Sequence, residues 1–220
     1  MVDQLNELDA ATVAANLITV RSEIVAAGRD LDAVEVLAAI KYLPGHLLGA
    51  LAEGGISVVG ENRAQALLEK QDAVGRELFA HWDFIGQLQS RKVKDLLGRV
   101  RFIHSLASES ALAQLERHEA GGTQVLVEVN VAGDPDKSGI APRELGAFIQ
   151  RCPVPVAGLM TMPPAAEDPE ASRPFFRLLA QLADEYSLAH LSMGTTQDYR
   201  VALEEGATII RLGSGLFSAS

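Results

Sequence analysis

The sequence predicts an α/β protein of one domain, a single (β/α)8 TIM-type barrel with an extra N-terminal helix. Eight short segments rich in aliphatic and β-branched residues alternate with helical segments along the chain, and parallel strands need crossover helices of this kind. The length of 220 residues suits one barrel or one doubly wound domain. An open doubly wound sheet remains the alternative, because periodicity alone does not show that a sheet closes.

The predicted elements follow in chain order. In the opening segment, Leu17, Val20 and Ile24 recur at helical spacing, which predicts an amphipathic helix. The predicted strands are residues 34–40, 57–60, 82–86, 100–105, 124–131, 154–160, 189–194 and 208–213. The clearest helical segments between them are residues 62–74, 108–120, 142–152 and 169–187. No linker or low-complexity stretch divides the chain, so we expect a single domain over residues 1–220.

Composition and charge exclude several functions. The formal net charge of -10 argues against a surface that binds nucleic acid. We interpret the main basic run, within residues 91–101, as a solvated helix face rather than a docking patch. Cys152 is the only cysteine, so we expect a small core residue, no disulfide and no thiolate metal cluster. The acidic start and the lack of long apolar runs predict no signal peptide, no membrane contact and a cytoplasmic location.

Polar residues or glycines stand at the ends of most of the predicted strands. They are Lys41, Glu61, Asn62, Gln87, His104, Asn130, Ser192, Gly194, Arg211 and Gly213. The carboxyl ends of the strands of a barrel converge on one face, where barrel enzymes keep their chemistry. We therefore expect these residues to form one site.

The last two predicted strands are each followed by a loop suited to phosphate. Gly-Thr-Thr occupies residues 194–196, and Gly-Ser-Gly occupies residues 213–215. Glycine lets backbone N–H groups approach phosphate oxygens, and a hydroxyl adds a further donor. Two such loops on neighbouring strands predict a phosphate site.

Lys41 ends the first predicted strand. Apolar neighbours would favour the neutral amine, which attacks carbonyl groups, whereas the alternative is a lysine whose ammonium group reaches solvent. A reactive lysine beside a phosphate site favours a phosphorylated aldehyde, of which pyridoxal phosphate is the commonest. Arg211 shares a strand face with Ile209 and Gly213, so it would face the pyridine nitrogen and disfavour protonation there. The alternative for Arg211 is a salt-bridged surface arginine.

Seven segments, in order along the chain, resemble pyridoxal phosphate homeostasis proteins of the YggS/PROSC type. They are IKY, GENRAQ, WDFIGQLQSRK, VNVAGDPDKSG, GLMTM, LSMGTTQDY and EEGATIIRLGSGLF. The resemblance implies a barrel like the amino-terminal part of alanine racemase, with pyridoxal phosphate linked to Lys41. By the same resemblance Asn62 would lie beside the ring and Arg211 would face the pyridine nitrogen. The resemblance assigns the phosphate to Gly194, Thr196, Gly213 and Ser214.

The chain departs from the family pattern at several of these positions. Tyr42 stands where serine or threonine is usual, and Arg63 stands where the family has tyrosine. Gln87 replaces a histidine, which places in doubt any proton-transfer role at that position. Thr196 keeps the hydroxyl of the usual serine, so phosphate binding should survive.

The resemblance implies a protein that carries and buffers pyridoxal phosphate, supplies it to apo-enzymes and has no catalytic activity of its own. A pyridoxal phosphate-dependent racemase-like enzyme acting on amino acids is the alternative, although its fold relatives use a second domain that we do not expect here. A Schiff-base aldolase of sugar phosphates would share the lysine and the phosphate loops. It would have no use for Arg211 against a ring nitrogen.

Overall fold

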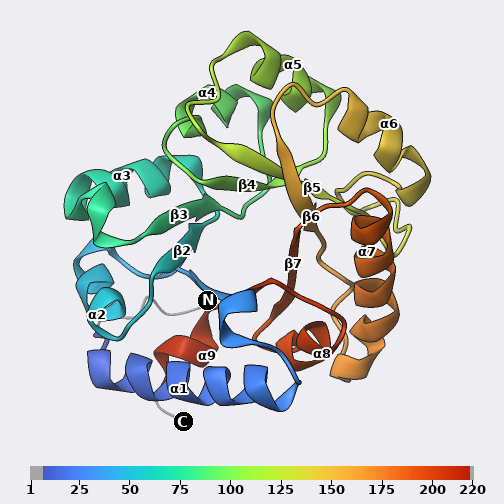
Figure 1. The fold of residues 1–220 in the computed structure, drawn as a ribbon. Coiled ribbons are helices and arrows are strands. Elements are labelled where there is room, and N and C mark those ends of the chain that lie inside the picture. The colour runs from blue at the N-terminus through green and yellow to red at the C-terminus, as the bar shows by residue number, and fades with distance from the viewer. Residues whose placement is uncertain (1–6, 219–220) are drawn as a thin grey trace.

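The strands close into a parallel barrel. The structure, a computed structural model, describes residues 7–218. Its eight strands pair in sequence order, and β8 pairs in parallel with β1 to complete the ring (Figure 1). The predicted barrel is therefore confirmed against the open sheet. Most of the acidic start, from which we predicted no signal peptide, lies outside the described residues.

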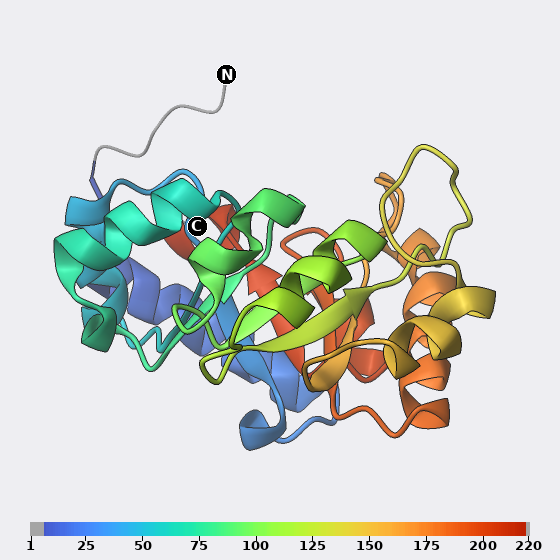
Figure 2. The same ribbon diagram turned by 90° about the horizontal axis from the view of Figure 1, so that it is seen from above.

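All eight strands lie within or beside their predicted segments. Their bounds are β1 Glu35–Ala39, β2 Val58–Glu61, β3 His81–Phe84, β4 Phe102–Leu106, β5 Gln124–Glu128, β6 Val156–Met160, β7 His190–Thr195 and β8 Ile209–Leu212. The largest difference is at β5, where the apolar run continues into the loop that projects from the barrel in Figure 2. There Val129 forms an isolated backbone bridge with Ile140 of the same loop, and its side chain is buried in the hydrophobic core.

Helices surround the strands, as Figure 1 shows. Their bounds are α1 Ala10–Ala26, α2 Leu48–Glu53, α3 Ala64–Val74, α4 Val93–Leu96, α5 Glu109–Arg117, α6 Leu145–Gln150, α7 Arg173–Glu185, α8 Tyr199–Glu204 and α9 Ser214–Phe217. Within residues 7–218, none of them has the length and apolar character that a membrane-spanning helix needs. Short 3₁₀ turns beginning with proline precede α6 and α7, because proline fits the first turn of a helix.

The extra N-terminal helix, α1, packs across α2 and α9. Asp9 caps it by accepting a hydrogen bond from the Thr12 N–H at 3.0 Å. Its predicted apolar face is buried, because Leu17, Val20 and Ile24 are all less than 5% exposed. The helix thus covers the place where β8 meets β1.

The hydrophobic core has an outer and an inner part. The outer part lies between the strands and the helices, and Cys152 packs half-buried against it. The inner part fills the barrel and consists of Leu37, Val58, Phe102, Leu126, Met160 and Ile209. Arg101 corrects one prediction, because this residue of the basic run does not lie on a solvated helix face. Since α4 ends at Leu96, Arg101 instead enters the amino end of the barrel and pairs with Glu35 and Asp83, each at 2.7 Å.

Candidate functional site

Lys41, Asn62 and Gly213 follow three neighbouring strands. β1 lies between β2 and β8, with Ala39 paired to Gly60 and Ala38 paired to Leu212. The pairing extends one residue past β1, because the Ile40 N–H donates to the Gly60 carbonyl at 2.9 Å. Barrel closure therefore brings residues from both ends of the chain to one edge.

Lys41 is exposed, so the expectation that apolar neighbours surround its amine is wrong. The physical reason is that β1 ends at Ala39 and the chain then turns, with the Leu43 N–H donating to the Ile40 carbonyl at 3.0 Å. This turn carries the lysine out to solvent, where its Nζ lies 4.7 Å from the centre of the Tyr42 ring. Lys41 has no ion-pair partner among residues 7–218, so no carboxylate there competes with a ligand for its amine.

A buried ion pair that the sequence did not reveal lies beneath this turn. Lys70 of α3 contacts the carboxylate of Glu61 and donates a hydrogen bond to the Ile40 carbonyl at 2.7 Å. Glu61 in turn accepts the backbone N–H groups of Asn62 and Arg63 at 2.7 and 3.2 Å. The pair therefore joins the Lys41 turn to the Asn62 loop. The one sign of this pair in the sequence is Lys70 itself, which follows the apolar residues Leu67 and Leu68 by two positions within α3.

Asn62 has an unused acceptor. Its side-chain oxygen is buried and accepts no hydrogen bond from any described residue. Buried polar atoms normally have partners, and an unpaired one needs an explanation. A ligand donor at this edge would satisfy it.

The loop after β7 is held in a fixed shape. Gly194 has φ of +89°, and a Cβ on it would lie 2.6 Å from the Ala202 Cβ, so only glycine fits there. Asp198 accepts the backbone N–H of Thr195 at 2.8 Å and its hydroxyl at 3.1 Å. These contacts leave Thr196 exposed at the tip.

The two predicted phosphate loops touch each other. The Gly213 N–H donates to the Thr196 hydroxyl at 3.5 Å. Ser214, the next residue, is exposed. The structure thus brings Gly194, Thr196, Gly213 and Ser214 to adjacent loops after β7 and β8.

Arg211 lies inside the barrel, which excludes the salt-bridged surface alternative. Its side chain donates to the Ser192 hydroxyl at 2.6 Å, to the Thr161 carbonyl at 3.0 Å and to the Met162 sulfur at 2.8 Å. No carboxylate of residues 7–218 lies within 4.0 Å of it. Burial lowers the pKa of Arg211 to about 10, against the more distant charges of Asp198 and Glu128. The group is therefore a buried cation at neutral pH without an ion-pair partner.

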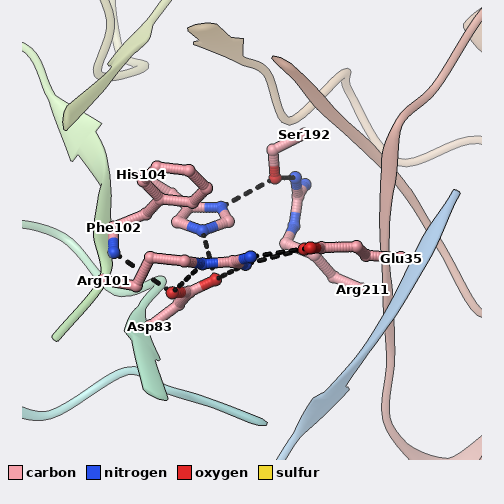
Figure 3. Close-up of polar contacts among 7 residues, drawn as sticks. All are labelled: Glu35, Asp83, Arg101, Phe102, His104, Ser192 and Arg211. Atoms are coloured by element: carbon pink, nitrogen blue, oxygen red, sulfur yellow. Dashed lines mark hydrogen bonds and ion pairs between the residues drawn. The ribbon is translucent and has the colours of Figure 1, made fainter. Parts of the chain in front are cut away.

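His104 does not reach the edge, contrary to the sequence prediction. It lies in the barrel interior, fully buried, between Ser192 and Asp83 (Figure 3). The reason is that β4 continues to Leu106, so His104 is central in the strand. Complete burial lowers the pKa of His104, although the carboxylate of Asp83 opposes this effect.

Two further predicted residues take no part in this edge. Gln87 is exposed in the loop after β3. Asn130 closes the loop after β5, since its amide donates to the Asp134 carbonyl at 2.7 Å. Near that loop, burial raises the pKa of Glu128, which accepts the Ser138 hydroxyl at 2.5 Å.

The fold and this edge define a single-barrel protein with an exposed amine, a buried cation and two hydroxyl-bearing loops at the carboxyl ends of its strands. No protein-family model matches the chain. The pyridoxal phosphate homeostasis protein of Aquifex aeolicus is 42% identical over 204 residues, which cover 87% of this chain and 89% of that protein. The protein of the same name from Pseudomonas aeruginosa is 34% identical and covers 95% of this chain and 96% of its own length. The chain belongs to the pyridoxal phosphate homeostasis protein family.

Solved structures show the same fold. PipY of Synechococcus elongatus, with pyridoxal phosphate bound, superposes with a TM-score of 0.78 at 27% identity, covering 94% of this chain and 100% of its own. Alanine racemase from Corynebacterium glutamicum has a TM-score of 0.73 at 14% identity, covering 96% of this chain and 61% of that protein. The racemase shares the barrel, as the resemblance implied.

Proposed function

We propose that this chain holds pyridoxal phosphate through a Schiff base on Lys41 and buffers or delivers it in the cytoplasm. The observation that carries the proposal is the position of Arg211, a buried cation without a carboxylate partner beside the two hydroxyl-bearing loops. Family membership and the bound pyridoxal phosphate of PipY support the same ligand. The whole chain, residues 1–220, would serve as one binding domain.

Lys41 would supply the bond to the aldehyde. Its amine is exposed and has no ion-pair partner among the described residues, so it can meet an incoming ligand. A Schiff base forms when an amine attacks the aldehyde carbon and water is lost. The link is reversible in water, as a protein that releases its ligand requires.

The phosphate would bind at the touching loops after β7 and β8. Thr196 and Ser214 offer exposed hydroxyls, Gly213 offers backbone without a side chain, and Gly194 permits the turn that carries Thr196. These loops neighbour Lys41, because β8 pairs with β1. A phosphorylated aldehyde would therefore lie across the junction of β1 and β8, with its aldehyde toward Lys41 and its phosphate toward the loops.

The ring would lie between Asn62 and Arg211. Asn62 offers a buried amide oxygen with no partner, which fits a polar substituent of the ring. Arg211 has five N–H donors, of which three protein bonds use at most three. A remaining donor would meet the pyridine nitrogen and, being a cation, would disfavour protonation there.

Such a site suits a carrier better than an enzyme. Bound pyridoxal phosphate supplies an electron sink whose strength depends on a protonated ring nitrogen, and Arg211 would weaken it. The curated relatives are named for homeostasis, which supports the same conclusion. We expect transfer of pyridoxal phosphate to apo-enzymes that depend on it.

Borohydride reduction tests the attachment. The purified protein is loaded with pyridoxal phosphate, reduced and digested with trypsin, which does not cleave at a modified lysine. A label on Lys41 joins two peptides into one that spans Asp30–Arg63, since no other lysine or arginine lies between those ends. A Lys41→Arg variant should lose this peptide, and a Lys137→Arg variant in the exposed loop after β5 should keep it. A label on another lysine, or none, would refute the proposed attachment.

Transfer and turnover assays test the carrier role. We expect the loaded protein to activate an apo-enzyme and to leave L-alanine and L-serine unchanged. Sustained racemisation of an L-amino acid that disappears in Lys41→Ala would establish the enzyme alternative instead.

A further inference from the structure

A hydrogen-bond chain crosses the barrel interior and ends on Arg211 (Figure 3). Asp83 of β3 contacts His104 Nε2 at 3.2 Å, and His104 Nδ1 contacts the Ser192 hydroxyl at 2.8 Å. The Ser192 oxygen then accepts from Arg211 at 2.6 Å. Asp83, His104 and Ser192 are all fully buried. Polar groups in a barrel core are costly unless every one is paired, so the chain constrains each member.

The donor and acceptor of every bond follow by elimination. Burial would raise the pKa of Asp83, but its hydrogen bonds with His104 and with the Arg101 cation lower the pKa overall. Asp83 is therefore an ionised carboxylate that only accepts, so His104 Nε2 must donate to it. The fully buried His104 is neutral, which leaves Nδ1 as an acceptor for the Ser192 hydroxyl proton. Ser192 then offers a lone pair to Arg211, which only donates.

Arg211 is therefore held by neutral acceptors on both sides. Ser192 of β7 holds one guanidinium nitrogen, and the Thr161 carbonyl after β6 holds the other. The acids that act on its charge, Glu128 at the end of β5 and Asp198 after β7, lie beyond ion-pair distance. Arg101, in contrast, is paired with two carboxylates and has its charge balanced. Of these two arginines inside the barrel, Arg211 is the one that keeps an uncompensated charge for a ligand.

We propose that Ser192 and His104 are positioning residues that hold Arg211 against the ring nitrogen of pyridoxal phosphate and so keep that nitrogen unprotonated. The inference rests on the proposed function. His104 fixes the Ser192 hydroxyl proton away from Arg211, and the Ser192 oxygen fixes the guanidinium plane. Without this support Arg211 would lose one of its two oxygen acceptors and could turn away from the ring.

Four variants separate positioning from a general loss of packing. Ser192→Ala removes the acceptor of Arg211, and Ser192→Thr restores the hydroxyl. Ser105→Ala is the matched control, since Ser105 is also buried on a barrel strand but donates to the Gly86 carbonyl, outside the chain. His104→Leu removes the group that orients the Ser192 proton. If Ser192→Ala does not fold, His104→Leu alone decides the outcome.

The readout is the ¹⁵N NMR signal of ring-labelled pyridoxal phosphate bound to each protein. We expect wild type, Ser192→Thr and Ser105→Ala to keep the unprotonated signal from mildly alkaline to mildly acidic pH. Ser192→Ala, and to a smaller degree His104→Leu, should shift toward the protonated position as the pH falls. A wild-type signal in both variants, with the label still on Lys41, would refute the inference and leave the proposed function intact. Failure of wild type to bind pyridoxal phosphate would refute both.

Discussion

Removal of Lys70 should destabilise the barrel strongly. Its side chain is 11% exposed and that of Glu61 is 0% exposed, so Lys70→Met leaves a buried carboxylate without its cation. Breaking a buried pair in this way costs about 3–5 kcal/mol. Glu61 keeps two backbone N–H donors, which limits the loss, so we expect about 3 kcal/mol.

Equilibrium unfolding in urea, followed by the fluorescence of the buried Trp82, measures this loss. With a slope of about 2 kcal/mol per molar urea, the midpoint should fall by about 1.5 M. Lys92→Met is the control, because Lys92 and Asp95 form a pair that is 34% and 30% exposed. Partly exposed surface pairs of this kind contribute about 0–1 kcal/mol.

A double variant tests the reasoning itself. In Lys70→Met with Glu61→Gln the amide oxygen still accepts the two N–H groups, and no buried charge remains. The double variant should therefore be more stable than Lys70→Met by at least about 1 kcal/mol. A loss of unfolding free energy below about 1 kcal/mol for Lys70→Met would show that the pair is not coupled as the structure indicates. The same conclusion would follow if the losses of Lys70→Met and Glu61→Gln summed to that of the double variant within about 0.5 kcal/mol.

Three further predictions concern the phosphate loops and the buried histidine. The double variant Thr196→Ala with Ser214→Ala should bind pyridoxal phosphate at least about tenfold more weakly in an equilibrium titration. The reason is that a hydrogen bond to a charged group contributes about 1.5–3 kcal/mol. Unchanged affinity would place the phosphate elsewhere. Gly194→Ala should lose bound pyridoxal phosphate, because φ at this residue is +89° and the new Cβ would lie 2.6 Å from the Ala202 Cβ. Gly49→Ala in α2 is the control, since its Cβ would meet nothing within 4 Å and binding should be unchanged. Equal retention by both variants would contradict the steric argument. Burial lowers the pKa of His104 from 6.5, so the unfolded chain takes up a proton first as the pH falls, and the unfolding free energy should decrease below about pH 6.5. His190, whose pKa burial also lowers, acts in the same direction, and Glu128 acts against it. Urea titrations should show a weaker decrease in His104→Leu, and an equal decrease would exclude His104 as its source.

The fold could be predicted because each strand carries its own signal. Apolar runs of strand length with helical segments between them indicate eight parallel strands. The first and last predicted strands are the two that pair to close the barrel. The bounds differed by a few residues, as at β5, where Val129 is buried in the core beyond the end of the strand and the apolar run continues into the loop. The apolar pattern of a short segment does not show where contacts with the rest of the chain end a strand.

The sequence could predict a site residue only where its position at the end of a strand determines its location in the barrel. Gly194, Thr196, Gly213 and Ser214 lie at strand ends, and barrel closure brings their loops together. Alternation also placed Arg211 on the interior face correctly, since Ile209 belongs to the inner core. The roles of these residues toward a ligand remain predictions.

Depth along the barrel axis could not be predicted. Arg101 and His104 both belong to one apolar segment, yet Arg101 lies at the amino end of the barrel and His104 lies in its middle. Their positions depend on where β4 begins and on how it is staggered against β3, and these depend on partner strands far away in the sequence. The exposure of Lys41 has a similar origin, because the turn after Ile40 is fixed by Lys70, which lies far along the chain in α3.

The two parts of the candidate site differ in exposure, and this difference bears on release. Arg211 is buried and held by Ser192 and Thr161, so it is rigid before a ligand arrives. Lys41, Thr196 and Ser214 are exposed, so water competes for each of them. A ligand held by a rigid cation inside and by solvent-accessible groups outside gains orientation from the first and stays exchangeable through the second. Burying the outer groups would tighten retention and slow transfer, so their exposure is what a carrier requires.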